Sequence, residues 1–482
     1  MENKGASTMT DRPNIQFGTD GWRAIIADEF TFANVRACGE AVARNLIATG
    51  RADQGLVVGF DTRFGSARFA QAVADVVNGF GISTYTFDVA APTPACSFAV
   101  VDHSAANGVM ITASHNPPEW NGFKVKSAAG GSATPDEVAQ IELHLADILD
   151  GRTDGSVSAN GQASNTVFDV MTPYIEQLHR VIDVAPIKAQ PLKVVVDAMH
   201  GSGAGVMPKM LAGGAIDVIE IRSDHNPNFP GMNQPEPIEQ NLIPLSEAVR
   251  ETGADVGIAL DGDADRVGIV DENGRYFSTL EVFSLLTDHF MGRRNERGGV
   301  ACTITMSSMV DKLSAHYDAP VYRTPVGFKF VGPAMTDNGC SMGGEESGGY
   351  AFKGHVPERD GSLSGLLFLE AMMMSGKKPS ELLTDLHTLV GPHTFRRDDI
   401  SYNESRRAGV AEKVASASPD SLGGLAVEAD DRRDGVRFDL AGGSWAVARM
   451  SGTEPLLRIY AETPDARSLD AVLGDLRSVL GV

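Results

Sequence analysis

Two short runs of this chain carry side chains that together could move a phosphoryl group. Ser114 lies in the run 112–117 (Thr-Ala-Ser-His-Asn-Pro), where its hydroxyl could act as a nucleophile. The run 261–266 places three carboxylates at alternating positions, on Asp261, Asp263 and Asp265. Oxygen ligands without Cys or His favour Mg²⁺ or another hard cation. The two runs therefore predict a nucleophile and a hard-cation site, the parts that phosphoryl transfer needs.

The serine run has other readings. A serine hydroxyl is a weak nucleophile unless a base or positive surroundings assist it, and here His115 adjoins Ser114 and Lys124 follows it. A plain strand-to-loop turn, in which Ser and Asn make local hydrogen bonds, would use the same residues. A Ser-His-Asp hydrolase is disfavoured because no Gly-x-Ser-x-Gly run surrounds Ser114.

The aspartate run could also be read as a calcium loop, since Glu272 falls at the twelfth position from Asp261. The sixth position is Arg266, however, where the sharp turn of a calcium loop requires glycine. The residues 267–270 (Val-Gly-Ile-Val) are typical of a strand, and an EF-hand needs helices on both sides. A magnesium-type loop is the better prediction.

Two further loops could bind a phosphorylated sugar. The glycine-rich run 343–349 allows close backbone approach to a ligand, and its Glu345 and Ser347 could hydrogen-bond sugar hydroxyls. The run 449–455 offers a guanidinium, two hydroxyls and backbone N–H groups that could wrap a phosphate, on Arg449, Ser451, Gly452 and Thr453. Each loop taken alone could be an ordinary turn.

The elements that must position these loops follow an α/β pattern. Short β-branched runs alternate with helical spacing, and several strands end directly before a candidate loop. The predicted strands are 56–60, 108–111, 193–197, 256–260 and 300–304, and a helix with apolar 69, 73, 76, 77 and 80 follows the first. The last eighty or so residues differ, with strands at 445–449 and 457–460 and an amphipathic helix from Ala466. We expect three α/β units and a smaller α+β unit.

Composition narrows the class of protein. The chain has 482 residues, 42% of them hydrophobic, which suits a globular protein of several domains. A formal net charge of −22 disfavours a nucleic-acid-binding surface, so a phosphate site must use locally clustered Arg and Lys. The four cysteines show no Cys-x-x-Cys pair, and no apolar run has the length of a membrane span. We expect a cytoplasmic enzyme with no membrane partner.

Taken together, the loops resemble the α-D-phosphohexomutase superfamily over nearly the whole chain. The runs 112–117, 261–266, 344–348 and 449–455 are similar to its phosphoserine, metal, sugar and phosphate loops, in that order, and 17–23 resembles its opening segment, which contains Arg23. The resemblance implies four domains around a central cleft. The boundaries we expect are 1–187, 188–297, 298–395 and 396–482.

The resemblance also implies a reaction cycle. Ser114 would be carried as a phosphoserine, with Mg²⁺ on Asp261, Asp263, Asp265 and a phosphoserine oxygen. Phosphoryl transfer to a hexose monophosphate would give a bound glucose 1,6-bisphosphate, which also serves as activator. Lys124 would be the general acid/base, and Arg23 and Arg266, with His115 beside the serine, would complete the catalytic set.

The preferred sugar is expected to be glucose. The run 324–330, with Gly327, looks like the specificity segment of phosphoglucomutases, and the pair Glu345-Glu346 fits that branch. Dual-specificity members tend to have His where this chain has Gly349, and His355 could take a neighbouring role. A site that does not contact C2 separates glucose from mannose poorly, so a phosphomannomutase or dual-specificity enzyme is the alternative. A phosphatase, or a non-catalytic sugar-phosphate-binding protein, is more distant. A monomer or homodimer is expected.

Overall fold

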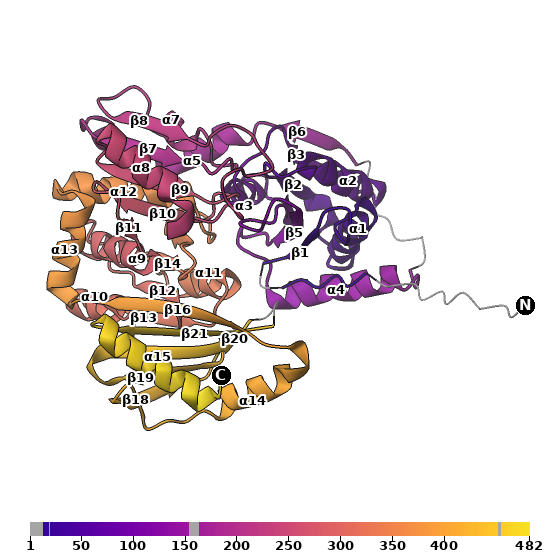
Figure 1. The fold of residues 1–482 in the computed structure, drawn as a ribbon. Helices are drawn as coiled ribbons and strands as arrows, with labels where there is room; N and C mark the ends of the chain where they lie inside the picture. Colours follow the sequence, from indigo (N-terminus) through magenta and orange to yellow (C-terminus); the bar gives the residue numbers. More distant parts are fainter. Residues whose placement is uncertain (1–12, 19, 154–162, 452–454) are drawn as a thin grey trace, which may run out of the picture.

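The computed structural model describes residues 13–18, 20–153, 163–451 and 455–482, which form four domains, each built on its own sheet. Figure 1 shows domain I (indigo) beside domain II, with domain III below domain II and domain IV (yellow) packed under domain III. The predicted strands 56–60, 193–197 and 256–260 are confirmed, and so is the helix that begins at Ala466. The expected fold class is confirmed as well.

Domain I is a mixed six-stranded sheet that is covered on both faces. Its strands, in spatial order, are β1 (Trp22–Ile25), β5 (Trp120–Lys126), β4 (Asn107–Ile111), β2 (Leu56–Phe60), β3 (Thr84–Phe87) and β6 (Asn165–Phe168). Its helices are α1 (Phe32–Ala48), α2 (Ser66–Gly79), α3 (Thr93–Asp102) and α4 (Pro135–Leu149). Side chains alternate between the faces of a strand, so Phe123 and Val125 of β5 enter the core under α1, α2 and α4. Lys124 and Lys126 therefore lie on the opposite face.

Domain II presents the aspartate run at the end of a buried strand. Its sheet has the order β11 (Tyr276–Phe277), β10 (Val267–Asp271), β9 (Val256–Leu260), β7 (Lys193–Asp197) and β8 (Asp217–Ile221). The associated helices are α5 (Met171–Val181), α6 (Ala185–Lys188), α7 (Val206–Leu211) and α8 (Ile243–Thr252). Antiparallel strands β9 and β10 flank the run 261–266, which excludes the helix–loop–helix of an EF-hand.

Domain III carries the glycine-rich loop between two short strands. Its sheet has the order β13 (Val321–Thr324), β12 (Val300–Thr303), β14 (Met342–Gly344) and β15 (Tyr350–Phe352). Its helices are α9 (Thr279–Asp288), α10 (Met309–Tyr317), α11 (Phe328–Asp337), α12 (Gly361–Ser375) and α13 (Pro379–Val390), with a π-helical turn at His289–Arg293. Helix α12 is apolar all round and contacts β9 and β10 of domain II as well as α9 and β15. It therefore joins domains II and III through one core.

Domain IV is an antiparallel sheet in the order β16 (Thr394–Ser401), β21 (Leu456–Thr463), β20 (Ser444–Met450), β19 (Val436–Leu440), β18 (Leu425–Asp431) and β17 (Ser421–Leu422). Helices α14 (Arg407–Ser416) and α15 (Ala466–Leu480) pack with Ala446 and Ala448 of β20 on one face. The alternate residues Trp445 and Val447 pack against Leu280 and Ile304 of domain III. This second face joins domain IV to domain III.

Short 3₁₀ turns complete the described elements, at Ala52–Gln54, Glu239–Asn241, Glu404–Arg406 and Ala441–Gly443. The predicted domain boundaries stay predictions, and α6 and β16 each run across one of them. Within the described ranges, no helix is both long and apolar enough to span a bilayer.

Candidate active site

The candidate loops follow strand ends, as expected for ligand sites in α/β sheets. Ser114 comes after β4, Asp261 after β9, Glu345 after β14 and Ser451 after β20. The loops of domains I and II are in direct contact, and Arg359 links the glycine-rich loop of domain III to the aspartate run. The fourth reaches domain III through Asp434.

The hydroxyl of Ser114 is directed at the aspartate run. Its Oγ lies 3.1 Å from Oδ2 of Asp261 and 3.4 Å from Nδ1 of His115, and Ser114 is buried. The backbone at Ser114 has a φ of 52°, a left-handed conformation that costs a non-glycine residue roughly 1 kcal/mol or more. Gly262 approaches so closely that a Cβ there would lie 2.6 Å from the Ser114 carbonyl oxygen. The serine and aspartate loops are thus in backbone contact.

The three aspartates form a compact, buried cluster. Their carboxylate oxygens lie within 4.8 Å of one another, and all three side chains are inaccessible to solvent. Burial, followed by the neighbouring aspartates, raises the pKa of Asp261 well above its usual range. Burial also raises the pKa of Asp265, although Arg359 opposes this. Carboxylates held this close repel one another when ionised, and a bound cation would stabilise their charged forms.

The donor set fits the Mg²⁺ that the resemblance implies. Oδ1 of Asp263 and Oδ1 of Asp265 are buried, and neither accepts a hydrogen bond from any residue that the structure describes. Unsatisfied buried oxygens of this kind are costly unless an ion or water meets them. Asp263 is further held by Thr93 at the start of α3, whose Oγ1 donates to Oδ2 at 2.6 Å. Burial alone would raise the pKa of Asp263, but Lys124 and Thr93 hold it below its usual range.

Lys124 is the central cation of the site. Its Nζ lies 2.8 Å from Asp20, 3.0 Å from Asp263 and 3.4 Å from Asp265, and the side chain is completely buried. Burial alone would lower the pKa of Lys124, but these carboxylates raise it above its usual range. The side chain of Lys124 therefore connects the opening segment of the chain with the aspartate loop.

Arg23 contacts the serine loop, Arg266 ends the aspartate run, and His115 adjoins Ser114. Arg23 donates from Nη1 to Oδ1 of Asn116 at 2.7 Å, and Arg266 donates to Glu236 at 2.8 Å. Burial, assisted by the charges of Arg266 and Arg23, holds the pKa of His115 well below its usual range. The imidazole of His115 is therefore neutral near pH 7 in this arrangement.

Glu345 joins the glycine-rich loop to the predicted specificity segment. Its Oε1 accepts a hydrogen bond of 2.8 Å from the backbone N–H of Gly327, and burial raises its pKa to about 7. The Oγ of Ser347 is buried and has no hydrogen-bond partner among the described residues, so it could bond a ligand. The fold thus brings Glu345 and Gly327, two predicted site residues from different loops, into direct contact.

The phosphate-type loop of domain IV begins at Arg449. Its Nε donates to Oδ2 of Asp434 at 3.1 Å, and the same oxygen accepts from the backbone N–H of Val326 at 3.0 Å. Ser451 is buried and its N–H donates to the carbonyl of Leu456. Gly452 and Thr453, also predicted here, lie outside the described residues.

Arg359 is a site residue that sequence reasoning missed. Its Nη2 lies 2.9 Å from Asp20 and 2.7 Å from Asp265, and its Nη1 lies 3.5 Å from Glu345. A Cβ at residue 349 would lie 2.2 Å from Cδ of Arg359, so Gly349 leaves the space that this arginine fills. Gly349, which stands where dual-specificity members tend to have His, was the sequence signal that could have pointed to Arg359.

Asp20 and the pair Lys126–Glu358 were also missed. Asp20 contacts Lys124 and Arg359, and Nζ of Lys126 lies 2.6 Å from Glu358 with both side chains fully buried. Asp20 adjoins Gly21, where a Cβ would lie 2.4 Å from the Phe123 carbonyl oxygen. That close approach to β5 is the reason for the glycine in the opening segment.

His355, considered as a neighbouring site residue, contacts structural partners. Its Nε2 lies 3.1 Å from Oδ2 of Asp360, which also accepts from the hydroxyl of Tyr174 at 2.8 Å. Asp360 caps helix α12 by accepting from the N–H of Leu363. The hydrogen bond from Tyr174 therefore joins α5 to the start of α12, and His355 contacts the same carboxylate oxygen.

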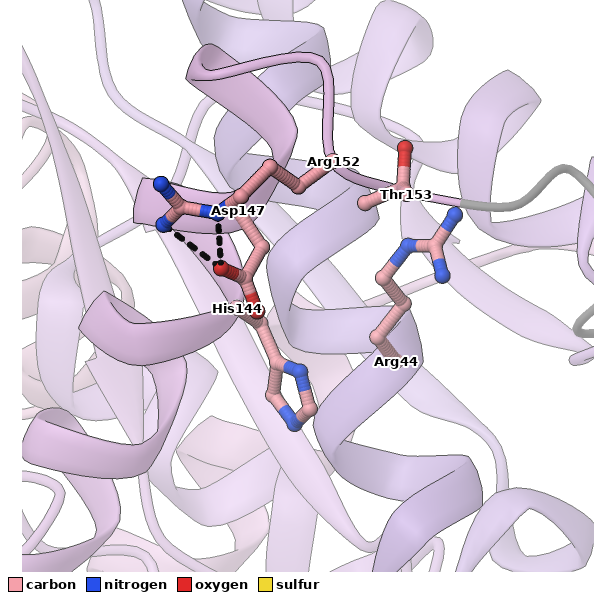
Figure 2. A pocket seen from close by; sticks show the side chains of 5 residues that line it. All are labelled: Arg44, His144, Asp147, Arg152 and Thr153. Atoms are coloured by element: carbon pink, nitrogen blue, oxygen red, sulfur yellow. Dashed lines mark hydrogen bonds and ion pairs between the residues drawn. The ribbon is translucent and has the colours of Figure 1, made fainter.

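A hollow in domain I involves none of the four loops. Figure 2 shows Arg44 of α1 and His144 and Asp147 of α4 around it, with Arg152 and Thr153 beyond the end of α4. Its arginines are paired: Arg152 lies 2.7 Å from Asp147, and Arg44 lies 2.8 Å from Glu40. This hollow contributes nothing to the arrangement described above.

The four-domain α/β fold, with Ser114 in contact with a buried aspartate cluster, is that of the α-D-phosphohexomutase superfamily. The chain belongs to the phosphoglucomutase/phosphomannomutase family. Models of that family's α/β/α domains I, II and III match residues 14–151, 172–274 and 281–389, and the model of its C-terminal domain matches 406–479.

Individual relatives cover the whole length but differ in described activity. A phosphoglucomutase/phosphomannomutase of Thermococcus kodakarensis is 34% identical over 92% of this chain and 94% of its own. A phosphoglucosamine mutase of Cereibacter sphaeroides is 31% identical over 95% of this chain and 97% of its own. A solved structure from Thermus thermophilus, described as a candidate phosphomannomutase, is 33% identical with a TM-score of 0.82, covering 97% of this chain and 99% of that one.

Proposed function

We propose that this phosphohexomutase interconverts glucose 1-phosphate and glucose 6-phosphate through a phosphoserine at Ser114. The observation that carries the proposal is the contact of Ser114 Oγ with Asp261, at 3.1 Å, beside unsatisfied oxygens on Asp263 and Asp265. A binding protein needs no buried nucleophile aimed at a cation site. Mg²⁺ on the three aspartates and a phosphoserine oxygen would offset the charge that develops during transfer.

The reaction conserves phosphate. The free hydroxyl oxygen of the hexose monophosphate attacks phosphorus, the bond from phosphorus to Ser114 Oγ breaks, and the hydroxyl proton is transferred so that Oγ ends protonated. The bound 1,6-bisphosphate reorients, and its other phosphate returns to Ser114 by the reverse step. Lys124 is the proposed general acid/base, and Arg23, Arg266 and His115 provide the local field around the serine.

The sugar and its far phosphate are held by the other two loops. Glu345 and Ser347 are proposed to bond sugar hydroxyls, with Gly327 fixing the carboxylate of Glu345. Arg449, Ser451, Gly452 and Thr453 are proposed to hold the phosphate that is not reacting. Holding the non-reacting phosphate places the opposite end of the sugar phosphate at the serine. This positioning can account for a large part of the rate.

Glucose is favoured over an amino sugar by the neighbours of the two glutamates. Arg359 lies 3.5 Å from Glu345, and Arg397 lies 3.5 Å from Glu346. These arginines offset the negative charge of the two glutamates, so the loop offers little net attraction to the ammonium group of an amino sugar. Phosphoglucosamine mutase activity is the second candidate, supported by a relative with that activity at 31% identity.

Phosphorus NMR of the wild-type enzyme tests the proposal, with Mg²⁺ and a trace of glucose 1,6-bisphosphate. The 1-phosphates of glucose, mannose and glucosamine are followed separately. Fastest conversion of the glucose ester supports the proposal, comparable rates for mannose indicate dual specificity, and fastest conversion of glucosamine establishes the second candidate. Net release of inorganic phosphate would indicate a phosphatase.

The Ser114→Ala variant tests the nucleophile. It should lose turnover on every sugar, and intact-mass measurement should lose the population heavier by one phosphate. Substantial turnover by this variant would rule out the phosphoserine mechanism. A wild-type chain that hexose 1,6-bisphosphate cannot phosphorylate would support the binding protein instead.

A further inference from the structure

Arg63 donates hydrogen bonds to several backbone carbonyls of the loop that contains Ser114. Its Nη2 donates to the carbonyls of Ser114 and Asn116, each at 2.6 Å. Its Nη1 donates to those of Pro117 at 2.8 Å and Trp120 at 3.1 Å. A single side chain from the segment after β2 therefore fixes four points of the turn between β4 and β5.

Only arginine can make this set of bonds. The planar guanidinium carries five N–H donors in a fixed fork, whereas a lysine ammonium is a compact point with three. The side chain of Arg63 is completely buried, and its Nε lies 3.3 Å from the carboxylate of Asp61. Asp61 is itself held by the hydroxyl of Ser66 at 2.8 Å. The guanidinium therefore has little freedom to reorient.

The same segment is braced from domain II. The guanidinium carbon of Arg63 lies 5.0 Å from the ring centroid of Phe229, and the hydroxyl of Thr62 donates to the carbonyl of His200 at 3.0 Å. Residues 62 and 63 thus contact both the serine loop and the domain that carries the aspartates. A displacement of Arg63 would change the position of Ser114 relative to Asp261.

We propose that Arg63 is a positioning residue for phosphoryl transfer, holding the left-handed backbone of Ser114 so that its phosphoryl group faces the sugar hydroxyl. Its bond to the Ser114 carbonyl restrains the residue whose φ is 52°. The inference rests on the proposed phosphoserine function and adds a residue that touches neither substrate nor metal. A sugar hydroxyl fixed by other loops needs this alignment, whereas a mobile water molecule needs it much less.

The test measures where the phosphoryl group goes. Wild-type enzyme and the Arg63→Lys variant are labelled at Ser114 with ³²P from glucose 1,6-bisphosphate, then chased with glucose 6-phosphate or with buffer. In the variant, transfer to sugar should slow by about 100-fold while hydrolysis changes by less than about threefold. In steady state, kcat should fall with KM nearly unchanged.

Arg51→Lys is the matched control, because Arg51 also ties backbone in domain I. It donates to the carbonyl of Ala106, just before the other end of β4, at 3.1 Å. This variant should keep the wild-type ratio of transfer to hydrolysis, whatever it does to thermal stability. Phe229→Leu keeps Arg63 but removes the ring under its guanidinium, and it should lower the ratio by about threefold, which gives a second test if the lysine variant does not fold.

The outcomes separate the inference from the function beneath it. Labelled Arg63→Lys and Phe229→Leu enzymes with the wild-type ratio would overturn the positioning role alone. So would equal slowing of transfer and hydrolysis, since that is the result of a purely structural defect. Wild-type enzyme that accepts no label at Ser114 would overturn the proposed function and this inference with it.

Discussion

Nη2 of Arg359 lies 2.7 Å from Oδ2 of Asp265, so an arginine of domain III neutralises part of the candidate metal site of domain II. Both side chains are buried. Replacing Arg359 by Gln leaves Asp20 and Asp265 with Lys124 as a shared cation and should destabilise the metal-free protein by about 3 kcal/mol. Added Mg²⁺ should restore more of the lost stability than it adds to wild type. Thermal unfolding in EDTA and in saturating Mg²⁺ measures both effects.

Arg275→Gln is the control for that comparison. Arg275 pairs with Glu281 at 2.8 Å, but its side chain is 50% exposed, and an exposed pair contributes about 1 kcal/mol or less. The Mg²⁺-induced shift of this variant should equal that of wild type. If Arg359→Gln also shows the wild-type shift, the arginine and the metal do not share Asp265.

The aspartate cluster should bind Mg²⁺ without substrate. Titration calorimetry should detect one site in the wild-type protein, and Asp265→Asn should weaken it by at least about 10-fold because a neutral amide replaces a charged carboxylate. Asp217→Asn, whose side chain is 62% exposed, changes the net charge equally and should leave the affinity unchanged. Equal weakening in both variants would argue for a diffuse charge effect.

Sugar binding should depend on pH through Glu345, whose pKa burial raises to about 7. Above that pH the carboxylate is ionised and can accept hydrogen bonds from sugar hydroxyls. Below it the carboxyl group is protonated and has less capacity to accept hydrogen bonds. KM should therefore rise as pH falls through 7. Phosphate esters also titrate near pH 6, so Glu345→Gln is compared across the same range. If the variant keeps the full wild-type dependence, Glu345 is not responsible.

Asp434 should control the binding of substrate more than its chemistry. One of its oxygens accepts from both Arg449 and the backbone of Val326, and so aligns the arginine against domain III. Asp434→Asn weakens a charge-assisted bond, so KM for glucose 1-phosphate should rise by about 10-fold, with kcat changed less. Steady-state kinetics decide this. A fall in kcat alone would place Asp434 in the chemical step.

The chemistry-bearing loops could be predicted because each is a short run after a strand. Ser114 and Asp261, which the sequence separates widely, lie in contact because both strands end at the same place in the fold. Strands β7 and β9 match their predicted residues, since continuous apolar runs between turn signals indicate buried strands. The magnesium-type reading of the aspartate run is supported by the strands on both sides.

What could not be predicted depends on contacts between domains. Arg359 and Asp20 are hundreds of residues apart, and neither lies in a run that by itself indicates chemistry. Arg63 follows a predicted strand, but its bonds are to backbone carbonyls, which leave no mark on residue types. His355 is the opposite case, because its sequence position suggests a role in chemistry that its contacts do not support. Its side chain pairs with Asp360, which caps helix α12. The spacing of residues along the chain does not show which distant side chains the fold brings into contact.

Strand β5 alternates two kinds of burial, with Phe123 and Val125 in an apolar core and Lys124 and Lys126 among carboxylates. Sliding β5 by one residue against β4 would exchange the two sets. Two ammonium groups would then enter hydrocarbon, and two apolar side chains would replace the partners of buried acids. The shifted register is thus unfavourable on both faces of β5. The ion pairs of the site therefore also help to specify the correct strand pairing when domain I folds.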